Sequence, residues 1–315
     1  MTRRYVFLFA SILAGCSSLR DGGGTGEPPR VAAAPESLGA AAPLELLLPM
    51  KEGSVRFAVF GDSGTGDAKQ REVARMMDRY HERFPFTFAV MVGDNIYEPD
   101  APADYRRKFE EPYANLLARG VKFYATLGNH DNPNQRFYAA FNMGGQRYYS
   151  FKPAPGVRFF AVDSTYLDPP QLEWLAKELA ASGSEWKIAF MHHPLYSSGD
   201  RHGPAVEKRE ALEPVLLKNG VSVVLMGHEH FYERLKPQKG VYYFISGGAA
   251  KLRPGTNVSD ITEKGFDTDR HFMLMEISGD ELYFQAISRT GQTVDSGKIR
   301  NPLKPAPETV RSTPK

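Results

Sequence analysis

Five short polar motifs, each directly after a run of apolar residues, restrict the fold more than any other feature of the chain. The motifs are GDSG after VRFAVF, GDNIYE after FAVMV, GNHD after KFYATL, HHP after WKIAFM and GHEH after VSVVLM. Short apolar runs rich in β-branched and aromatic residues are typical of buried strands. Glycine and polar residues then end each strand, where a loop can present side chains to a ligand. We therefore expect buried strands whose ends gather these loops.

The rest of the chain alternates predicted strands with helices and then becomes almost entirely strand. Helical character is expected over 67–83, part of 104–119, 169–181 and 204–218. Strands are expected over 55–60, 86–92, 121–127, 148–151, 157–162, 186–191, 221–226, 242–246, 271–277, 281–288 and 292–299. Alternating strands and helices indicate layers around a buried sheet, and SGDEL and RTGQT are hairpin signals. The sequence predicts an α/β fold with two β-sheets packed face to face, helices outside them, and the polar loops at one sheet edge.

Seven side chains in these loops can bind a metal ion. They are Asp62, Asp94, Tyr97, Asn129, His192, His228 and His230. Catalytic metal pairs lie about 3.5–4 Å apart, so one ligand usually bridges the two ions. Asp94 suits that position, because it has two carboxylate oxygens and lies between the other motifs. His228 and His230 are two residues apart at a strand end, where side chains at i and i+2 share a face.

Tyr97 indicates the kind of metal. A phenolate is a hard, anionic ligand and favours a hard, highly charged ion, for which ferric iron is the natural candidate. A trivalent and a divalent ion together carry about +5, and Asp62, Asp94 and ionised Tyr97 supply about −3. The remaining charge of about +2 suits a hydroxide and an anionic substrate.

Each of these residues has a structural alternative when taken alone. Asp62 and Asp94 can cap the element that follows, Asn129 can serve a turn, and Tyr97 can pack half-buried. The joint pattern is what favours a metal site, since seven such residues follow strands in one chain. Asp163, which ends another strand, is interpreted as structural, and His193 as a loop contact beside the ligand His192.

The motif set resembles, in order, that of the purple acid phosphatases within the calcineurin-like metallophosphoesterases. The wider family usually begins with Asp-x-His and continues with GD-x-x-DR. This chain has Gly64 in place of that histidine and Tyr97-Glu98 in place of Asp-Arg, and both departures are those of the purple subgroup. The segment HHPLYSSGDRHGP is similar to the small, mammalian-type members. The resemblance covers about 57–250.

The resemblance implies a role for each residue of the site. Asp62, Tyr97 and His230 are expected on Fe(III), Asp94 as the bridge, and Asn129, His192 and His228 on a divalent ion that is iron, zinc or manganese. His130 and His202 are expected above the metals, in contact with the phosphate and the leaving group. Which of these two histidines donates the proton stays open.

The implied activity is that of an acid phosphatase. Phosphomonoesters are hydrolysed by in-line attack of a metal-bound hydroxide on phosphorus, while an acid protonates the departing alkoxide. One alternative is a phosphodiesterase or nucleotide hydrolase, for which the loops at 132–145 and 197–203 would be decisive. The other alternative is a lipoprotein that kept the scaffold as a binding module without turnover.

The N-terminal residues predict export and a lipid anchor. Arg3 and Arg4 precede the apolar run 5–13, which is too short to span a bilayer comfortably but matches a secretory signal. LAGC resembles a bacterial lipobox, in which Cys16 is lipidated, and Ser17 favours the outer membrane. We therefore expect a lipoprotein signal peptide over 1–15 and an extracytoplasmic protein, periplasmic or on the cell surface.

Composition assigns the remaining segments. Residues 16–50 are rich in Ser, Gly, Ala and Pro and are expected to form a flexible tether, followed by one catalytic domain over 51–300. Residues 301–315 are proline-rich and polar, and are expected to be a disordered tail. The net charge of +2 argues against a nucleic-acid partner. Cys16 is the only cysteine, which excludes an intrachain disulfide, and we expect a monomer.

Overall fold

The structure is a computed structural model that describes residues 44–255 and 258–303. The predicted signal peptide, the lipidation site at Cys16, most of the predicted tether and nearly all of the predicted tail lie outside the described residues. No helix within the described ranges combines the length and apolar character that crossing a bilayer requires.

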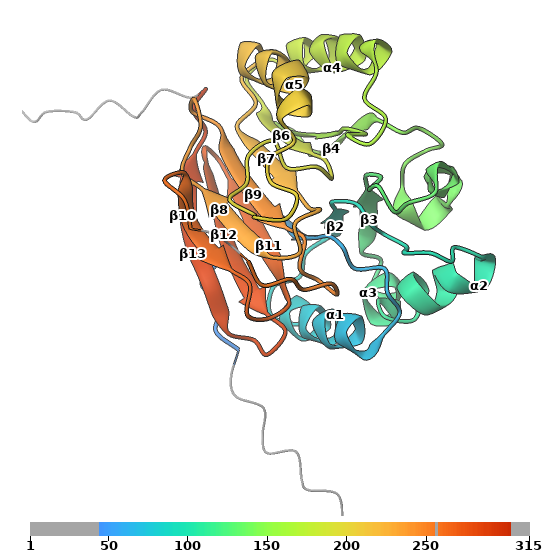
Figure 1. Ribbon diagram of the computed structural model, residues 1–315. Helices are drawn as coiled ribbons and strands as arrows, with labels where there is room; N and C mark the ends of the chain where they lie inside the picture. Colours follow the sequence, from blue (N-terminus) through green and yellow to red (C-terminus); the bar gives the residue numbers. More distant parts are fainter. Residues whose placement is uncertain (1–43, 256–257, 304–315) are drawn as a thin grey trace, which may run out of the picture. The chain divides into compact units, whose positions relative to one another are not determined.

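Two mixed β-sheets form the centre of the fold (Figure 1). The first sheet has the order β13-β12-β11-β1-β2-β3 and the second has the order β10-β8-β9-β7-β6-β5-β4. The strands of the first sheet are β1 (Val55–Phe60), β2 (Phe88–Met91), β3 (Lys122–Ala125), β11 (His271–Ser278), β12 (Glu281–Ser288) and β13 (Thr293–Arg300). Those of the second are β4 (Tyr149–Ala154), β5 (Val157–Ala161), β6 (Trp186–Phe190), β7 (Val223–Met226), β8 (Tyr232–Leu235), β9 (Tyr242–Ser246) and β10 (Thr262–Phe266).

Within each sheet the strands that precede the polar motifs run parallel to one another. In the first sheet β1, β2 and β3 are parallel, and β11 joins β1 antiparallel. In the second sheet β5, β6, β7 and β9 are parallel, and β4 and β8 flank them antiparallel. Parallel strands end at the same edge of a sheet, so their C-terminal loops are brought together.

Alternating side chains along each strand divide the core into layers. In β1, Phe57 and Val59 pack into the core between the sheets, whereas Ala58 and Phe60 pack into the core on the outer face. In β7, Val223 faces the core between the sheets and Val224 the outer one. This period of two, with both faces apolar, is what a strand buried on both sides requires.

Helices cover both outer faces (Figure 1). α1 (Ala68–His81) and α3 (Ala114–Ala118) pack on the first sheet, and α4 (Pro169–Ala181) and α5 (Val206–Lys218) on the second. The segment between β2 and α3 holds the short α2 (Pro102–Tyr105) and a π-helical turn over Arg106–Glu110, and two 3₁₀ turns follow β3 at Pro133–Phe137 and Ala139–Phe141. The predicted fold class is therefore confirmed.

The structure corrects the sequence-based assignment in two places. β8 and β10 were not predicted, because YERL is only four residues long and TEKGF is a polar edge strand. The predicted tether also ends earlier than residue 50. Leu48 is buried, the backbone N–H of Met50 donates to the Glu276 carboxylate at 2.8 Å, and the segment LELLLPM packs on the first sheet because it is itself apolar.

Candidate metal centre

The loops that carry the predicted ligands follow the C-terminal ends of five parallel strands, three in one sheet and two in the other. Asp62 follows β1, Asp94 and Tyr97 follow β2, Asn129 follows β3, His192 follows β6, and His228 and His230 follow β7. The crevice beyond the carboxyl ends of parallel strands is the usual ligand site of α/β folds. The structure brings all seven side chains together there.

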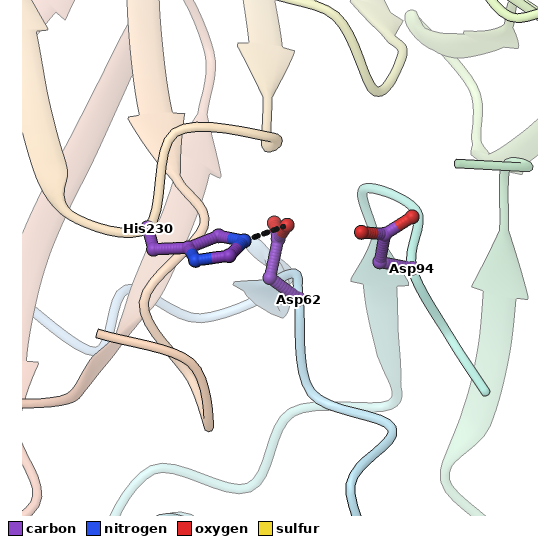
Figure 2. A group of neighbouring side chains, drawn as sticks. All are labelled: Asp62, Asp94 and His230. Atoms are coloured by element: carbon purple, nitrogen blue, oxygen red, sulfur yellow. Dashed lines mark ion pairs between the residues drawn. The ribbon is translucent and has the colours of Figure 1, made fainter. Parts of the chain in front are cut away.

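Asp62, Tyr97 and His230 form one half of the cluster. The phenol oxygen of Tyr97 lies 3.4 Å from Asp62 Oδ1 and 3.4 Å from His230 Nε2. His230 Nε2 lies 3.3 Å from Asp62 Oδ1. Figure 2 shows His230 directed at Asp62, with Asp94 beside them. One donor atom each from Asp62, Asp94 and His230 lie within 4.8 Å of one another, which is a spacing that one ion can span.

Asn129, His192 and His228 form the other half. His192 Nε2 lies 3.0 Å from Asn129 Oδ1 and 3.1 Å from His228 Nδ1. The same nitrogen lies 3.4 Å from Asp94 Oδ1. Asp94 therefore contacts His192 and lies within 4.8 Å of the donor atoms of Asp62 and His230, which is the position that a bridging carboxylate needs.

The chemistry of the donor set fits metal ions. His192 Nδ1 lies 2.9 Å from the carbonyl oxygen of Val92. That oxygen can only accept, so Nδ1 carries a hydrogen, and Nε2 is the ring nitrogen that is left to bind a metal ion. Nε2 faces the Asn129 oxygen and the Asp94 carboxylate, so three atoms that can bind a cation converge here.

The charges of the site lead to the same conclusion. Within residues 44–255 and 258–303, the only basic side chains whose nitrogens lie within 4.0 Å of the Asp62 and Asp94 carboxylates are the imidazoles of His230 and His192, although both carboxylates are buried. Burial raises the pKa of Asp62. Burial also acts to raise the pKa of Asp94, but His192, the His130 N–H and Tyr97 hold it below its usual value. Buried carboxylates that lack a lysine or arginine partner are stabilised by metal ions.

The imidazoles and the phenol are in the protonation states that these surroundings impose. Burial, with the charge of Arg253, lowers the pKa of His230 to about 4, and burial lowers the pKa of His228 further. Both rings are therefore neutral near pH 7 and can offer a lone pair to a metal. Burial and the Asp62 carboxylate raise the pKa of Tyr97, so this phenol ionises only against a strongly charged cation.

Close backbone approach at Gly64 places Tyr97 in the cluster. A Cβ at residue 64 would lie 2.0 Å from the backbone oxygen of Asn95. The N–H of Gly64 donates to the carbonyl of Asp94, and the N–H of Tyr97 donates to the carbonyl of Gly64 at 2.9 Å. The absence of a side chain at residue 64 therefore allows the loops after β1 and β2 to join.

His130 and His202 lie at the rim of the cluster. The His130 N–H donates to Asp94 Oδ1 at 3.1 Å, and the His130 ring centroid lies 5.0 Å from that of Tyr97. The His202 ring centroid lies 4.4 Å from that of His228. Both side chains are beside the proposed ligands without belonging to the contacts that join them. Their roles in proton transfer and phosphate binding stay predictions.

Two residues of the site region were not identified from the sequence. Asp131 is buried and accepts the N–H groups of Gly128 at 2.7 Å and Ile96 at 3.0 Å, which ties the loops after β2 and β3 together. Burial, followed by the charge of Asp94, raises the pKa of Asp131 to about 7. Lys251 places its ammonium 4.6 Å from the Tyr97 ring centroid. Asp131 stands in the GNHD motif, whereas nothing in the sequence near Lys251 marks it.

The residues that we interpreted as structural have structural contacts. Asp163 accepts from the Arg147 guanidinium at 2.8 Å and from the N–H of Thr165 at 3.0 Å. His193 Nδ1 lies 3.0 Å from the Ser164 hydroxyl, and its ring centroid lies 4.7 Å from that of His228. These side chains support loops around the cluster.

Known proteins resemble the chain over most of its length. A family model described as calcineurin-like phosphoesterase matches residues 55–232. Purple acid phosphatase 3 of Arabidopsis thaliana is 28% identical over 277 residues, which is 75% of this chain and 75% of that protein. Tartrate-resistant acid phosphatase type 5 of Homo sapiens is 24% identical over 314 residues, 82% of this chain and 96% of that protein. Among solved structures, GAP50, described as the anchor in the inner membrane complex of Plasmodium, has a TM-score of 0.69 at 18% identity and covers 79% of this chain and 89% of its own.

Proposed function

The chain belongs to the calcineurin-like phosphoesterase family, and from that premise we propose that it is an acid phosphatase that hydrolyses phosphomonoesters at a site for two metal ions. The observation that carries the proposal is the convergence of possible metal-binding atoms at His192 Nε2, which lies 3.0 Å from Asn129 Oδ1 and 3.4 Å from Asp94 Oδ1. A binding module without turnover has no need to keep this arrangement.

We propose that Asp62, Tyr97 and His230 hold a ferric ion. Asn129, His192 and His228 would hold a divalent ion, and Asp94 lies between the two sets of ligands. The support for iron is chemical: a phenol whose pKa is raised by burial and by two carboxylates becomes a ligand only for a hard ion of high charge. When bound, such a pair of ions polarises a phosphoryl oxygen and lowers the pKa of a water molecule.

The protein's own residues supply the remaining chemistry. A cavity of about 340 Å³ lies beside Asn129 and His130, with Tyr166 on its wall, and provides room for the ester group. His130 and His202 lie on the rim within reach of a phosphate bound at the cluster. We propose that these histidines hydrogen-bond the phosphate and that one of them gives a proton to the departing alkoxide, since an alkoxide is a poor leaving group.

Metal analysis with a visible spectrum, followed by assays on a panel of mono- and diesters, tests the proposal. The purified protein should contain about two metal ions per chain, absorb visible light through Tyr97-to-iron charge transfer, and hydrolyse monoesters faster than diesters. Tyr97→Phe should remove the absorption. Asp94→Ala should lose metal and activity together.

Each other result has a definite meaning. A colourless active protein with two divalent ions would contradict the ferric assignment and leave the phosphatase proposal intact. Faster cleavage of diesters or nucleotides would assign the chain to another activity of the same family. No hydrolysis of any ester in metal-replete protein would favour a binding module.

A further inference from the structure

Glu229 stands between His228 and His230 in the GHEH motif, but its carboxylate contacts a different loop. Its side chain is buried, and Oε1 accepts the backbone N–H of His202 at 3.2 Å and of Gly203 at 2.9 Å. These bonds join the loop after β7 to the segment 197–203 after β6. Glu229, which stands between two proposed metal ligands in the sequence, therefore holds the loop that carries His202.

The backbone of that loop is shaped around the Glu229 carboxylate. A Cβ at Gly199 would lie 2.5 Å from Glu229 Oε1 and 2.6 Å from its carboxyl carbon. The carboxylate thus lies against Gly199 and the N–H groups of His202 and Gly203. The free-energy cost of burying a carboxylate is offset when it accepts charge-assisted hydrogen bonds, as Glu229 does.

A second buried carboxylate holds the beginning of the same loop. Glu233 in β8 accepts the N–H of Ser198 at 3.0 Å, the hydroxyl of Ser198 at 2.5 Å and that of Thr262 at 2.7 Å. Glu233 in β8 therefore holds the beginning of the loop, and Glu229 in the turn before β8 holds its end. With the His202 N–H itself held, the His202 ring is kept 4.4 Å from the His228 ring.

We infer that Glu229 is a positioning residue that holds His202 as the proton donor to the leaving group of the phosphate ester. This inference rests on the proposed function. As an oxygen from water bonds to phosphorus and the ester phosphorus–oxygen bond breaks, the ring N–H of the His202 imidazolium transfers its proton to the ester oxygen, which leaves as the alcohol, and the ring regains the proton that the attacking water releases. Glu229 does not touch the substrate.

The experiment compares two esters that differ in their need for an acid. p-Nitrophenyl phosphate has a stable leaving group and needs little protonation, whereas glycerol 2-phosphate leaves as an alkoxide and needs it. His202→Ala should reduce kcat for glycerol 2-phosphate about 100-fold more than for p-nitrophenyl phosphate. Glu229→Ala should show the same selectivity, about 10-fold or more, with metal content unchanged. The double variant should be no worse than His202→Ala, because both changes act on one proton transfer.

Gly199→Ala tests the positioning role of Glu229 if the Glu229→Ala variant does not fold. The added methyl group displaces the loop from an intact Glu229, so the same selective loss on glycerol 2-phosphate is expected. Asp200→Asn is the matched control: it removes an exposed carboxylate of the same loop and should leave the ratio of the two rates at the wild-type value.

Several outcomes would overturn the inference. These are an equal loss on both esters, a loss of metal in Glu229→Ala, independent effects in the double variant, or a wild-type ratio in Gly199→Ala or His202→Ala. The proposed function fails separately, because its failure is seen in the wild type as no hydrolysis of either ester.

Discussion

Three of the proposed ligands adopt a backbone conformation that their residue types disfavour. The φ angles of Asp62, Asp94 and His228 are 55°, 51° and 70°. Left-handed backbone at residues other than glycine costs about 1–3 kcal/mol each and persists where the surrounding structure imposes it. In Asp62 the left-handed conformation is imposed by backbone hydrogen bonds on both sides, since its N–H donates to the Gly93 carbonyl and its own carbonyl accepts from the Ala250 N–H. Of the six described non-glycine residues with positive φ, three are proposed ligands, which supports their functional role.

His271 provides a prediction about pH. It begins β11, is fully buried and packs its ring 5.5 Å from that of Tyr232. Burial lowers its pKa to about 3, and a contact with the Asp269 backbone opposes the shift in part. Below about pH 6.5 the unfolded chain binds a proton here and the folded protein does not, so stability present above that pH is lost as the pH falls. Between pH 8 and 5 the loss should be about 2 kcal/mol.

Urea unfolding of metal-replete protein at pH 8 and pH 5 measures this effect. His271→Phe should reduce the difference between the two unfolding free energies by about 2 kcal/mol, whatever its own stability at pH 8. An unchanged difference would show that His271 is protonated inside the folded protein.

At the scale of elements, the loops after β1 and β2 form one unit through Gly64. The Cβ of Gly64→Ala would meet the Asn95 backbone, which cannot rotate away. The 94–97 segment must then shift. Because the Tyr97 N–H is hydrogen-bonded to the carbonyl of residue 64, the Tyr97 phenol is displaced as well. We expect the variant to lose its visible absorption and about 100-fold in activity, because a displacement of about 1 Å in an active site lowers the rate by about that factor.

Gly120→Ala separates this effect from general destabilisation. Gly120 follows α3 at a φ of 80° and has open space around its Cα, so alanine there strains the backbone without touching the site. It should lower the melting temperature and keep metal content and colour. A Gly64→Ala protein with the wild-type spectrum would contradict the role assigned to this close approach.

At the scale of the whole molecule, the metal ions should hold the two sheets' loops together. Asp62, Asp94 and Asn129 come from the first sheet, and His192 and His228 from the second. A ligand present at 100 times its Kd stabilises the folded state by about 2.7 kcal/mol, which for a domain of this size corresponds to roughly 5–10 °C in Tm. Chelation should lower Tm by that amount in the wild type and have no effect on Asp94→Ala. An unchanged Tm in protein verified as metal-free would contradict a structural contribution from the ions.

We also propose that the protein is attached to a membrane through lipidated Cys16, on the basis of the LAGC sequence. Expression in a bacterium followed by fractionation tests this. The wild type should sediment with membranes and carry the mass of a lipid at its N-terminus. Cys16→Ser should lose both properties, and sedimentation of that variant with membranes would contradict the anchor.

The sequence determined the chemistry of the site and most of the elements that carry it. Donor types such as the Asp94 carboxylate and the His192 imidazole are properties of single residues, and strands such as β1 and β9 follow from local runs of apolar residues. The predicted bounds of α4, β1, β9 and β12 agree with the structure because each of these segments has a strong local pattern.

Only the tertiary structure decided which side chains meet. Strand order, the attachment of residues 44–50 to the first sheet and the contact of Glu229 with His202 depend on pairings between segments far apart in the chain. Such a pairing cannot be predicted from a local sequence pattern, because it becomes stabilising only when the sheets have packed. The sequence therefore specifies the donor atoms, and long-range packing specifies where they converge.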